Sequence, residues 1–338
     1  MNSSPELAQA HLDSLSLKSS DHDLVSVIVP FLNEQDTLIK LNDRISEAFS
    51  SLNNPYEVIF VDDGSVDEGV KIAEGLSETD NHVRVIRFTR NFGKAAAISA
   101  GFREARGSIV VTMDADLQDD PAEIPNFLQK LSEGNDYVSG WKQNRNDPLG
   151  KTLPSKIFNW MTSKLFNIEI HDINCGFKAY TRRATNHLNL YGEMHRFTPA
   201  ILHSAGYQGA EIPVKHSARE FGVSKYGSKR MIKGLLDMFT VKMMTTYNAR
   251  PLHFFAMIGL PLCLLGTLFI AYLSALWVLD LGPIGNRPLL LIGILLFVTG
   301  TQVLSVGFVA ELFQSSRIRE NQKYVIDQVT ENGRRIEK

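Results

Sequence analysis

Two apolar runs near the C-terminal end constrain this chain more than any other feature. Residues 254–278 and 288–310 contain no Asp, Glu, Lys or Arg. A helix needs about 20 apolar residues to cross a hydrocarbon core of roughly 30 Å. The link over 279–287 holds two glycines, a proline and an asparagine, which suit a tight turn. The pattern therefore predicts two transmembrane helices joined as a hairpin.

The charges around this hairpin predict its orientation. Basic residues gather before the first run and after the second, whereas the link carries only Arg287 beside Asp280. The positive-inside rule places both termini in the cytoplasm. Residues 228–247 mix methionines, leucines and lysines, which favours an interfacial helix over a core helix. The first 23 residues are polar and Ser-rich, unlike a secretory signal, and are expected to be disordered.

These observations give a predicted organisation for the chain. It comprises a disordered tail over 1–23, a cytoplasmic soluble domain over 24–227, amphipathic juxtamembrane helices over 228–250, two membrane helices within 251–313 and a cytoplasmic tail over 314–338. The net charge of -2 argues against a nucleic-acid-binding protein, which would carry a strongly basic face. Cys175 and Cys263 form no paired pattern, so no disulfide framework or zinc site is predicted.

The soluble part alternates short apolar runs with amphipathic segments. Strands are predicted over 24–30, 56–61, 83–88, 109–113 and 137–141, and helices over 34–52, 66–77, 93–106 and 121–133. Continuous apolar strands separated by helices indicate a mostly parallel sheet covered on both faces. The predicted class is α/β with a doubly wound, Rossmann-like core, in which ligands bind beyond the carboxyl ends of the strands. No G-x-G-x-x-G dinucleotide motif follows the first strand.

Acidic residues follow directly after the fourth predicted strand. Asp114 and Asp116 leave a buried strand two positions apart, and Gln118 continues the alternation. In an extended segment such residues point to one side, so they can face one cation. Carboxylate oxygens suit Mg²⁺ or Mn²⁺ bound together with substrate phosphates. The alternative is a surface turn with solvated aspartates.

A second polar cluster follows the second and third predicted strands. Asp62 and Asp63 stand where a carboxylate can accept hydrogen bonds from a base or a ribose. Ser65 with Glu68 fits a capping box for the next helix. Lys94 begins a predicted helix, where backbone N–H groups and the ammonium can meet phosphate, although a solvated helix start is equally consistent.

Several motifs in order resemble glycosyltransferase family 2, and more narrowly dolichol-phosphate mannosyltransferases and bacterial bactoprenol glucosyltransferases. They are VPFLNE over 29–34, DDGS over 62–65, RNFGK over 90–94, DADLQDDP over 114–121, DINCGF over 172–177, HR at 195–196 and REFGVSKY over 219–226. With the paired apolar runs, the resemblance extends from residue 24 to about residue 313.

The resemblance implies a GT-A fold and a set of site residues. The nucleotide-sugar side would involve Pro30, Asn33, Glu34, Asp62, Asp63, Lys94 and Asp114; the metal side Asp114, Asp116 and Gln118; and the acceptor side Asp172, Arg219, Ser224 and Lys225. Asp116, Asp172, Arg219 and Lys225 are the expected catalytic residues. The family also implies inversion, the cell inner membrane as location and a multi-pass protein.

The acceptor can also be argued from chemistry. A sugar hydroxyl needs a general base, whereas a phosphate acceptor is already anionic and needs cations. Arg219, Lys225, Lys229 and Arg230 lie just before the membrane segment, where a lipid head group would arrive. They equally suit attraction to anionic lipids. The expected acceptor is a polyprenyl phosphate such as undecaprenyl phosphate.

Other functions remain open at the level of sequence. A processive polysaccharide synthase should carry more spans and a Q-x-x-R-W motif, of which residues 314–318 hold only a partial copy. A non-catalytic membrane scaffold would have lost Asp116 or the basic loop, and both are present. A nucleotidyltransferase would also use metal and nucleotide. Glucose from UDP-glucose is the expected sugar, GDP-mannose is the second donor, and the hairpin allows a homo-oligomer.

Overall fold

The structure is a computed structural model that describes residues 24–52, 54–143, 149–215, 229–247, 250–285, 287–318, 329–331 and 334–336. The chain divides into two compact units, residues 1–241 and 242–338. Each unit is described by itself.

The N-terminal unit is built on a seven-stranded sheet of order β3-β2-β1-β4-β6-β5-β7. Its elements are β1 Val25–Phe31, α2 Leu38–Ser50, β2 Tyr56–Asp62, α3 Gly69–Thr79, β3 Val83–Arg87, α4 Lys94–Glu104, β4 Ile109–Thr112, η1 Pro121–Glu123, α5 Ile124–Ser132, β5 Tyr137–Trp141, α6 Leu149–Phe166, β6 Lys178–Thr181, α7 Arg182–His187, η2 Met194–Arg196, α8 Thr198–Ser204, β7 Gly209–Pro213 and α9 Lys229–Thr246. The α/β class and the five strands predicted from the sequence are confirmed.

The sheet is mostly parallel, with one strand reversed. β6 lies between β4 and β5 and runs antiparallel to both. β5 and β7 are parallel to each other, as are the neighbours among β1 to β4. The sequence pattern missed β6 and β7, because β6 is only four residues long and β7 is only half-buried, so neither forms a long apolar run.

Two predicted helix starts were too early. Helix α2 begins at Leu38 rather than residue 34, and α3 begins at Gly69 rather than residue 66. The predicted capping box is also wrong. The Ser65 hydroxyl accepts the N–H of Asn33 at 3.0 Å, and Asp67 rather than Ser65 accepts the first helical N–H, from Gly69 at 3.0 Å. Ser65 therefore serves a cross-loop contact, and Asp67 provides the local hydrogen bond at the helix start.

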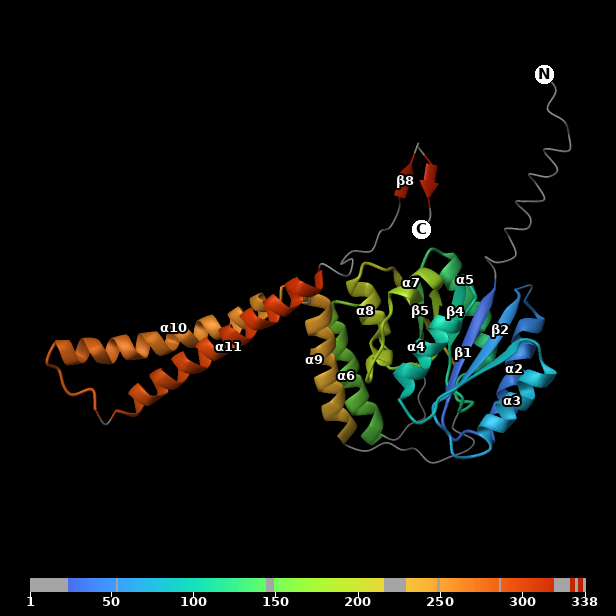
Figure 1. Cartoon of the computed structure of the whole chain (residues 1–338), viewed down its shortest axis with the longest axis horizontal. Helices are drawn as coiled ribbons and strands as arrows, with labels where there is room; N and C mark the ends of the chain where they lie inside the picture. The colour runs from blue at the N-terminus through green and yellow to red at the C-terminus, as the bar shows by residue number, and fades with distance from the viewer. Residues whose placement is uncertain are drawn as a thin grey trace, which may run out of the picture. The chain divides into compact units, whose positions relative to one another are not determined.

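One face of the sheet packs into a single hydrophobic core with α2 and α5. Helix α2 places Leu38, Leu41, Ile45 and Phe49 at helical spacing, all buried against alternate residues of β1 and β2. At the far end of the unit, α6 and α9 lie side by side (Figure 1), and the Thr162 hydroxyl on α6 contacts Met238 Sδ on α9 at 3.4 Å.

Helix α9 combines the two interpretations that the sequence left open. Met238 and Val241 are buried, as in a core helix, whereas Leu236 and Phe239 are 63% and 52% exposed. One side of the helix is therefore packed and another presents apolar side chains outward. That outward side suits a membrane interface.

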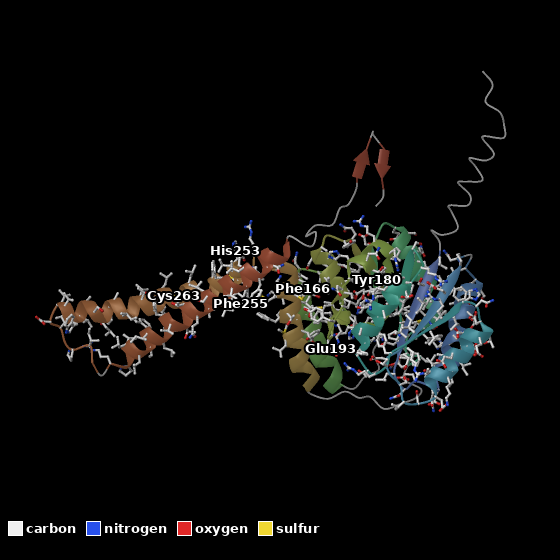
Figure 2. All side chains as sticks on the ribbon, viewed as in Figure 1. Phe166, Tyr180, Glu193, His253, Phe255 and Cys263 are labelled. Carbon is white, nitrogen blue, oxygen red and sulfur yellow. The ribbon has the colours of Figure 1, made fainter. Side chains whose placement is uncertain are left out.

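The C-terminal unit contains two long helices, α10 Pro251–Val278 and α11 Pro288–Ile318. A two-stranded sheet follows, formed by β8 Val329–Glu331 and β9 Arg334–Ile336. Both helices are long and apolar enough to cross a membrane. A Cβ on Gly266 would lie 2.6 Å from the carbonyl oxygen of Gly293, so glycines let the two backbones pack tightly. Cys263, labelled on α10 in Figure 2, packs in the same way against Gly300. The two predicted membrane segments thus form a helical hairpin.

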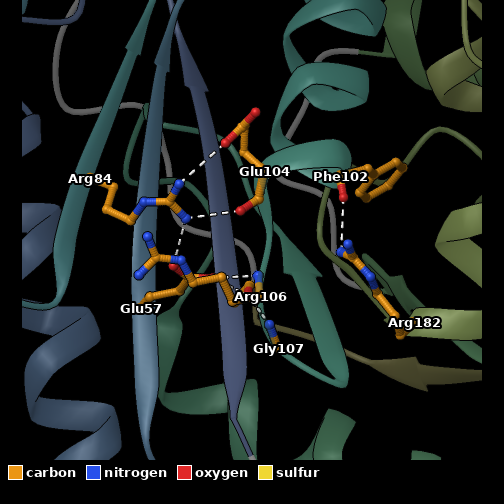
Figure 3. Close-up of polar contacts among 8 residues, drawn as sticks. Glu57, Arg84, Phe102, Glu104, Arg106, Gly107 and Arg182 are labelled. Atoms are coloured by element: carbon orange, nitrogen blue, oxygen red, sulfur yellow. Dashed lines mark hydrogen bonds and ion pairs between the residues drawn. The ribbon is translucent and has the colours of Figure 1, made fainter. Parts of the chain in front are cut away.

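A buried polar network closes the sheet at the end opposite the predicted site. The Glu57 carboxylate accepts hydrogen bonds from the Ser26 hydroxyl at 2.6 Å, the Arg106 N–H at 2.7 Å and the Arg84 guanidinium at 2.9 Å. Figure 3 shows how Arg84 also reaches the backbone and side chain of Glu104. Burial raises the pKa of Glu57, but these hydrogen bonds and the Arg84 charge outweigh it, so the pKa lies below 4.5.

We expect Glu57→Gln to lower the free energy of unfolding by about 2 kcal/mol at pH 7, because it removes the charge that satisfies Arg84 and two other donors. Because folding lowers the Glu57 pKa, this stabilisation is present above about pH 4.5 and is lost as the pH falls through the folded-state value. Chemical denaturation of the detergent-solubilised chain, followed by circular dichroism, measures both effects. Glu104→Gln is the control, since Glu104 is 57% exposed. Equal losses in the two variants would contradict the prediction.

Candidate active site

Strands β2, β1 and β4 are neighbours in the sheet, and their carboxyl ends lie at one edge. Most of the polar residues predicted from the sequence follow these ends. Pro30 is buried within β1, Glu34 is half-buried and Asn33 is exposed in the loop that follows. The strand order therefore brings the predicted nucleotide and metal residues to the same edge.

Asn33 joins the loops that follow β1 and β2. Its backbone has a positive φ of 56°, a conformation that asparagine tolerates better than most residues. Its N–H donates to the Ser65 hydroxyl at 3.0 Å, and its side-chain oxygen accepts the N–H of Val66 at 2.9 Å. Asn33 thus holds the loop after β1 against the loop after β2.

The two adjacent aspartates Asp62 and Asp63 have different surroundings. The Asp63 carboxylate accepts the N–H groups of Phe92 and Gly93 at 2.7 and 3.0 Å, which ties down the loop leading to Lys94. Asp62 is fully buried; its Oδ1 accepts the N–H of Ser65 at 2.8 Å. Its Oδ2 is buried with no hydrogen-bond partner within the described part of the chain. Asp62 therefore has the acceptor capacity for a ligand, and Asp63 holds the loop.

Lys94 begins α4, as predicted, and its ammonium pairs with the Asp114 carboxylate. Burial raises the pKa of Asp114, but the charges of Lys94 and Lys142 outweigh it and bring the pKa to about 2. Asp114 is therefore ionised at any physiological pH. The pair places one anion and one cation at the centre of the edge.

The segment after β4 is a turn, which corrects one sequence argument. The prediction placed Asp114, Asp116 and Gln118 on one side of an extended strand. The strand instead ends at Thr112, residues 115 and 116 form a turn, and Leu117 has a φ of 59°. Asp116 is buried, and its Oδ1 accepts the N–H of Gln118 at 3.3 Å. Any convergence of these three side chains comes from the turn and not from strand alternation.

These residues fit a hard divalent cation that shares its coordination with a substrate. Among the described residues, no three His, Cys, Asp or Glu side chains converge into a complete metal site. The turn does supply an ionised Asp114, a buried Asp116 and the amide of Gln118. Mg²⁺ and Mn²⁺ commonly take one or two carboxylates from the protein and complete their shell with phosphate oxygens and water. The donor set is therefore of the correct type for such a cation.

The sequence analysis missed a buried ion pair beside this turn. Asp119 is fully buried, and its carboxylate lies 2.8 Å from Lys142 Nζ, just past the end of β5. Burial alone would lower the pKa of Lys142, but Asp119 and other nearby anions outweigh it and raise the pKa. The signal was a basic residue directly following a buried strand, the position that the predicted aspartates occupy after β2 and β4.

Asp172 lies in a loop that packs against the same site. It is 2% exposed, and its backbone N–H donates to Glu211 on β7 at 2.9 Å. The neighbouring His171 is exposed, stacks on Trp141 at 4.3 Å between ring centroids and contacts the same Glu211 at 2.8 Å. Glu211 is a second residue that sequence reasoning missed, because it comes from a strand that the pattern did not show.

Gly176 brings this loop into contact with the segment after β4 that carries Asp114. A Cβ at Gly176 would lie 2.7 Å from Asp114 Oδ1 and 2.9 Å from its Cγ. The carbonyl oxygen of Gly176 accepts the Thr112 hydroxyl at 3.0 Å. Only glycine allows this approach, which joins the loop of Asp172 to the Asp114 carboxylate.

His195, in η2, is a buried imidazole that interacts electrostatically with Lys94 and Asp114. Burial lowers its pKa, and the charges of Lys94, Arg196 and Lys178 lower it further, well below 6.5. Its Nδ1 is buried and has no hydrogen-bond partner among the described residues. The ring is therefore neutral at pH 7. Arg219, Ser224 and Lys225, predicted for the acceptor side, lie outside the described residues.

Comparison with known proteins agrees with this geometry. Residues 26–188 match the family model described as glycosyl transferase family 2. The chain is 35% identical over 317 residues to dodecaprenyl-phosphate galacturonate synthase of Rhizobium johnstonii, covering 90% of this chain and 92% of that protein. It is 33% identical to undecaprenyl-phosphate 4-deoxy-4-formamido-L-arabinose transferase of Pseudomonas paraeruginosa, covering 91% and 90%.

Solved structures resemble the chain in fold. Glucosyl-3-phosphoglycerate synthase of Mycobacterium tuberculosis, in a complex with Mn²⁺, uridine-diphosphate-glucose and phosphoglyceric acid, matches with a TM-score of 0.52 at 17% identity. The match covers 68% of this chain and 81% of that one. At this identity the likeness concerns the fold alone, and it agrees with the predicted GT-A class.

Proposed function

The chain belongs to glycosyl transferase family 2, and on that premise we propose that it transfers a sugar from a nucleotide-sugar to a polyprenyl phosphate, with inversion, at the cytoplasmic face of the inner membrane. The observation that carries the proposal is full-length similarity to two relatives whose names both specify a polyprenyl phosphate and a sugar. The candidate membrane hairpin supports it, because the lipid acceptor is membrane-bound.

The nucleotide would bind where β1 and β2 end. At these strand ends Asp62 has a buried oxygen without a partner among the described residues, so it would accept a hydrogen bond from the base or the ribose. Pro30 and Glu34 line the same edge, and Asn33 holds the two loops together. Asp63 acts indirectly, because its carboxylate is occupied by the loop that carries Lys94.

The diphosphate would lie at the turn after β4. Asp114, Asp116 and Gln118 would hold Mg²⁺ or Mn²⁺, which stabilises the negative charge that develops on the departing diphosphate. Lys94 at the start of α4 contributes a second positive charge beside Asp114. Its helix N-terminus adds backbone N–H groups suited to phosphate.

The acceptor phosphate needs cations to approach an anionic donor. We assign that role to Arg219 and Lys225, with Ser224 offering a hydrogen bond to the phosphate and Asp172 orienting it or taking its remaining proton. Asp172 suits this because it is held at the backbone by Glu211 and lies in the loop that touches Asp114 through Gly176. The phosphate oxygen would then attack the anomeric carbon, the bond from that carbon to the diphosphate would break, and the nucleoside diphosphate would leave. Because the acceptor is already anionic, no acceptor hydroxyl has to be deprotonated.

Galacturonic acid is our first candidate for the sugar, because the relative with 35% identity is named for galacturonate. Glucose and mannose remain predictions from the sequence resemblance. We also propose that both termini are cytoplasmic, as the basic residues on each side of the hairpin predict. A homo-oligomer through the hairpin remains a proposal.

Radiolabelled transfer tests the function. Membranes containing the protein would receive undecaprenyl phosphate and a panel of UDP-galacturonate, UDP-glucose and GDP-mannose, with and without EDTA. We expect label from one donor to enter the lipid fraction and EDTA to abolish it. Label in a water-soluble polymer would favour the processive synthase instead. No lipid label from any donor, with nucleotide still bound, would refute the polyprenyl-phosphate assignment.

A further inference from the structure

A row of polar residues runs across the sheet from the central strand β4 to the edge strand β7. Thr112 on β4 pairs with Lys178 on β6, Lys178 with Ser139 on β5, and Ser139 with Glu211 on β7. Cross-strand partners in register point to the same face of a sheet. Their chain neighbours Val111, Ala179 and Val138 point to the other face, into the hydrophobic core. The row therefore lies on the face away from that core.

Three members of the row hold the backbone of one loop. The Glu211 carboxylate accepts the N–H groups of His171 and Asp172 at 3.0 and 2.9 Å. Lys178 Nζ donates to the carbonyl oxygen of Ile173 at 3.2 Å, and the Thr112 hydroxyl donates to that of Gly176 at 3.0 Å. The loop over 171–176, which carries Asp172, is thus bound at three points by side chains from three strands.

Lys178 differs from the other members because it carries a buried positive charge. It is 2% exposed, as is Asp172. Burial lowers the pKa of Lys178 to about 8, opposed by the negative charges of Asp172 and Asp114 and aided by the charge of Lys94. Burying an ammonium is costly unless a nearby anion compensates it. The anion within the loop that Lys178 itself holds is Asp172.

We propose that Lys178 is a positioning residue for Asp172: its ammonium tethers the loop at Ile173 and supplies the counter-charge that keeps the Asp172 carboxylate in place. The inference rests on the proposed acceptor-side role of Asp172. The substrate does not touch Lys178, whose effect passes through the loop. Replacing it therefore affects the transfer step more than nucleotide binding.

The test is a double-mutant cycle in the full-length protein in detergent, with Lys178→Met, Asp172→Asn and both together. We expect Lys178→Met to lower kcat about 10²-fold, as small misplacements of catalytic groups do. The dissociation constant for UDP with Mn²⁺ should change less than about 3-fold, because Lys178 holds the loop over 171–176 and not the loops after β1 and β2. The double variant should be no slower than Asp172→Asn, and Lys178→Arg should recover about 10-fold because it keeps the charge.

Two further variants keep the test decisive. Lys130→Met makes the same chemical change on the exposed surface of α5 and should transfer at the wild-type rate. Glu211→Gln removes the anionic tether at the other end of the loop. It should also lower kcat with little change in UDP binding, and it keeps the test available if Lys178→Met folds poorly.

The outcomes separate this inference from the proposed function. Rate losses that add in the double variant, or a parallel loss of UDP binding, would overturn the positioning role. If the wild type transfers sugar, Asp172→Asn transfers slowly and Lys178→Met transfers at the wild-type rate, the positioning role of Lys178 would be overturned and the proposed function would stand. A wild-type protein that forms no lipid-linked sugar would overturn both.

Discussion

Asp116→Asn should reduce the rate of sugar transfer by about 10²- to 10³-fold, the magnitude that removal of one electrostatic stabiliser produces in other enzymes. Asp116 is 7% exposed, and asparagine has nearly the same volume, so the fold should tolerate the change. The substitution removes a negative charge, which a hard cation prefers in a ligand. The loss should therefore concern metal-dependent chemistry rather than stability.

The measurement is the rate of transfer to undecaprenyl phosphate across a titration of Mn²⁺ and Mg²⁺. The wild-type rate should rise with metal and saturate, whereas the variant should stay flat or require far more metal. Asp120→Asn is the matched control, because Asp120 lies four positions further on and instead accepts hydrogen bonds from Arg44 and the N–H of Ala122, both at 3.1 Å. Normal, metal-dependent transfer by Asp116→Asn would remove Asp116 from the metal site.

Gly176→Ala should lower kcat about 10²-fold, because a shift of about 1 Å in a catalytic group has effects of that size. The added methyl would lie 2.7 Å from Asp114 Oδ1. The Asp114 side chain is short and is already paired with Lys94. Either the Asp114 carboxylate or the loop of Asp172 must move. Both movements separate the metal side of the site from the acceptor side.

Transfer kinetics with a thermal melt of the same sample would distinguish misplacement from unfolding. Gly75→Ala is the control, since a Cβ there meets nothing within 4 Å and alanine favours the helix. We expect that variant to transfer normally and to be at least as stable as the wild type. A Gly176→Ala enzyme with an unchanged kcat would show that Asp114 and the loop tolerate separation.

The sequence alone was sufficient for the α/β class of the soluble part, and several candidate site residues that it predicted lie at one edge of the sheet. Apolar runs of 23 residues or more predicted the two helices of the hairpin, because a helix of about 20 apolar residues is long enough to cross a membrane. Strand and helix periodicity is likewise local, so the alternation around β1 to β5 was readable. Asp62, Lys94, Asp114 and Asp116 were predicted because each follows a buried strand or begins the helix after it.

Local geometry was less readable than element order. The extended alternation predicted for Asp114, Asp116 and Gln118 is replaced by a turn, and the capping box at Ser65 by a bond to Asn33. At Ser65 a hydrogen bond to a distant loop replaces the predicted cap, and after Thr112 the chain leaves the extended conformation. The same contacts separate the roles of Asp62 and Asp63, which are indistinguishable as neighbours in a sequence.

Only the tertiary structure revealed the row that supports Asp172. Thr112, Ser139, Lys178 and Glu211 come from four strands, and their register depends on β6 running antiparallel between β4 and β5. No periodicity within any one strand reports which residue lies beside it on the next. The sequence therefore determined what kind of elements form and where each ends, while the pairing of distant strands decided which buried charges meet at the site.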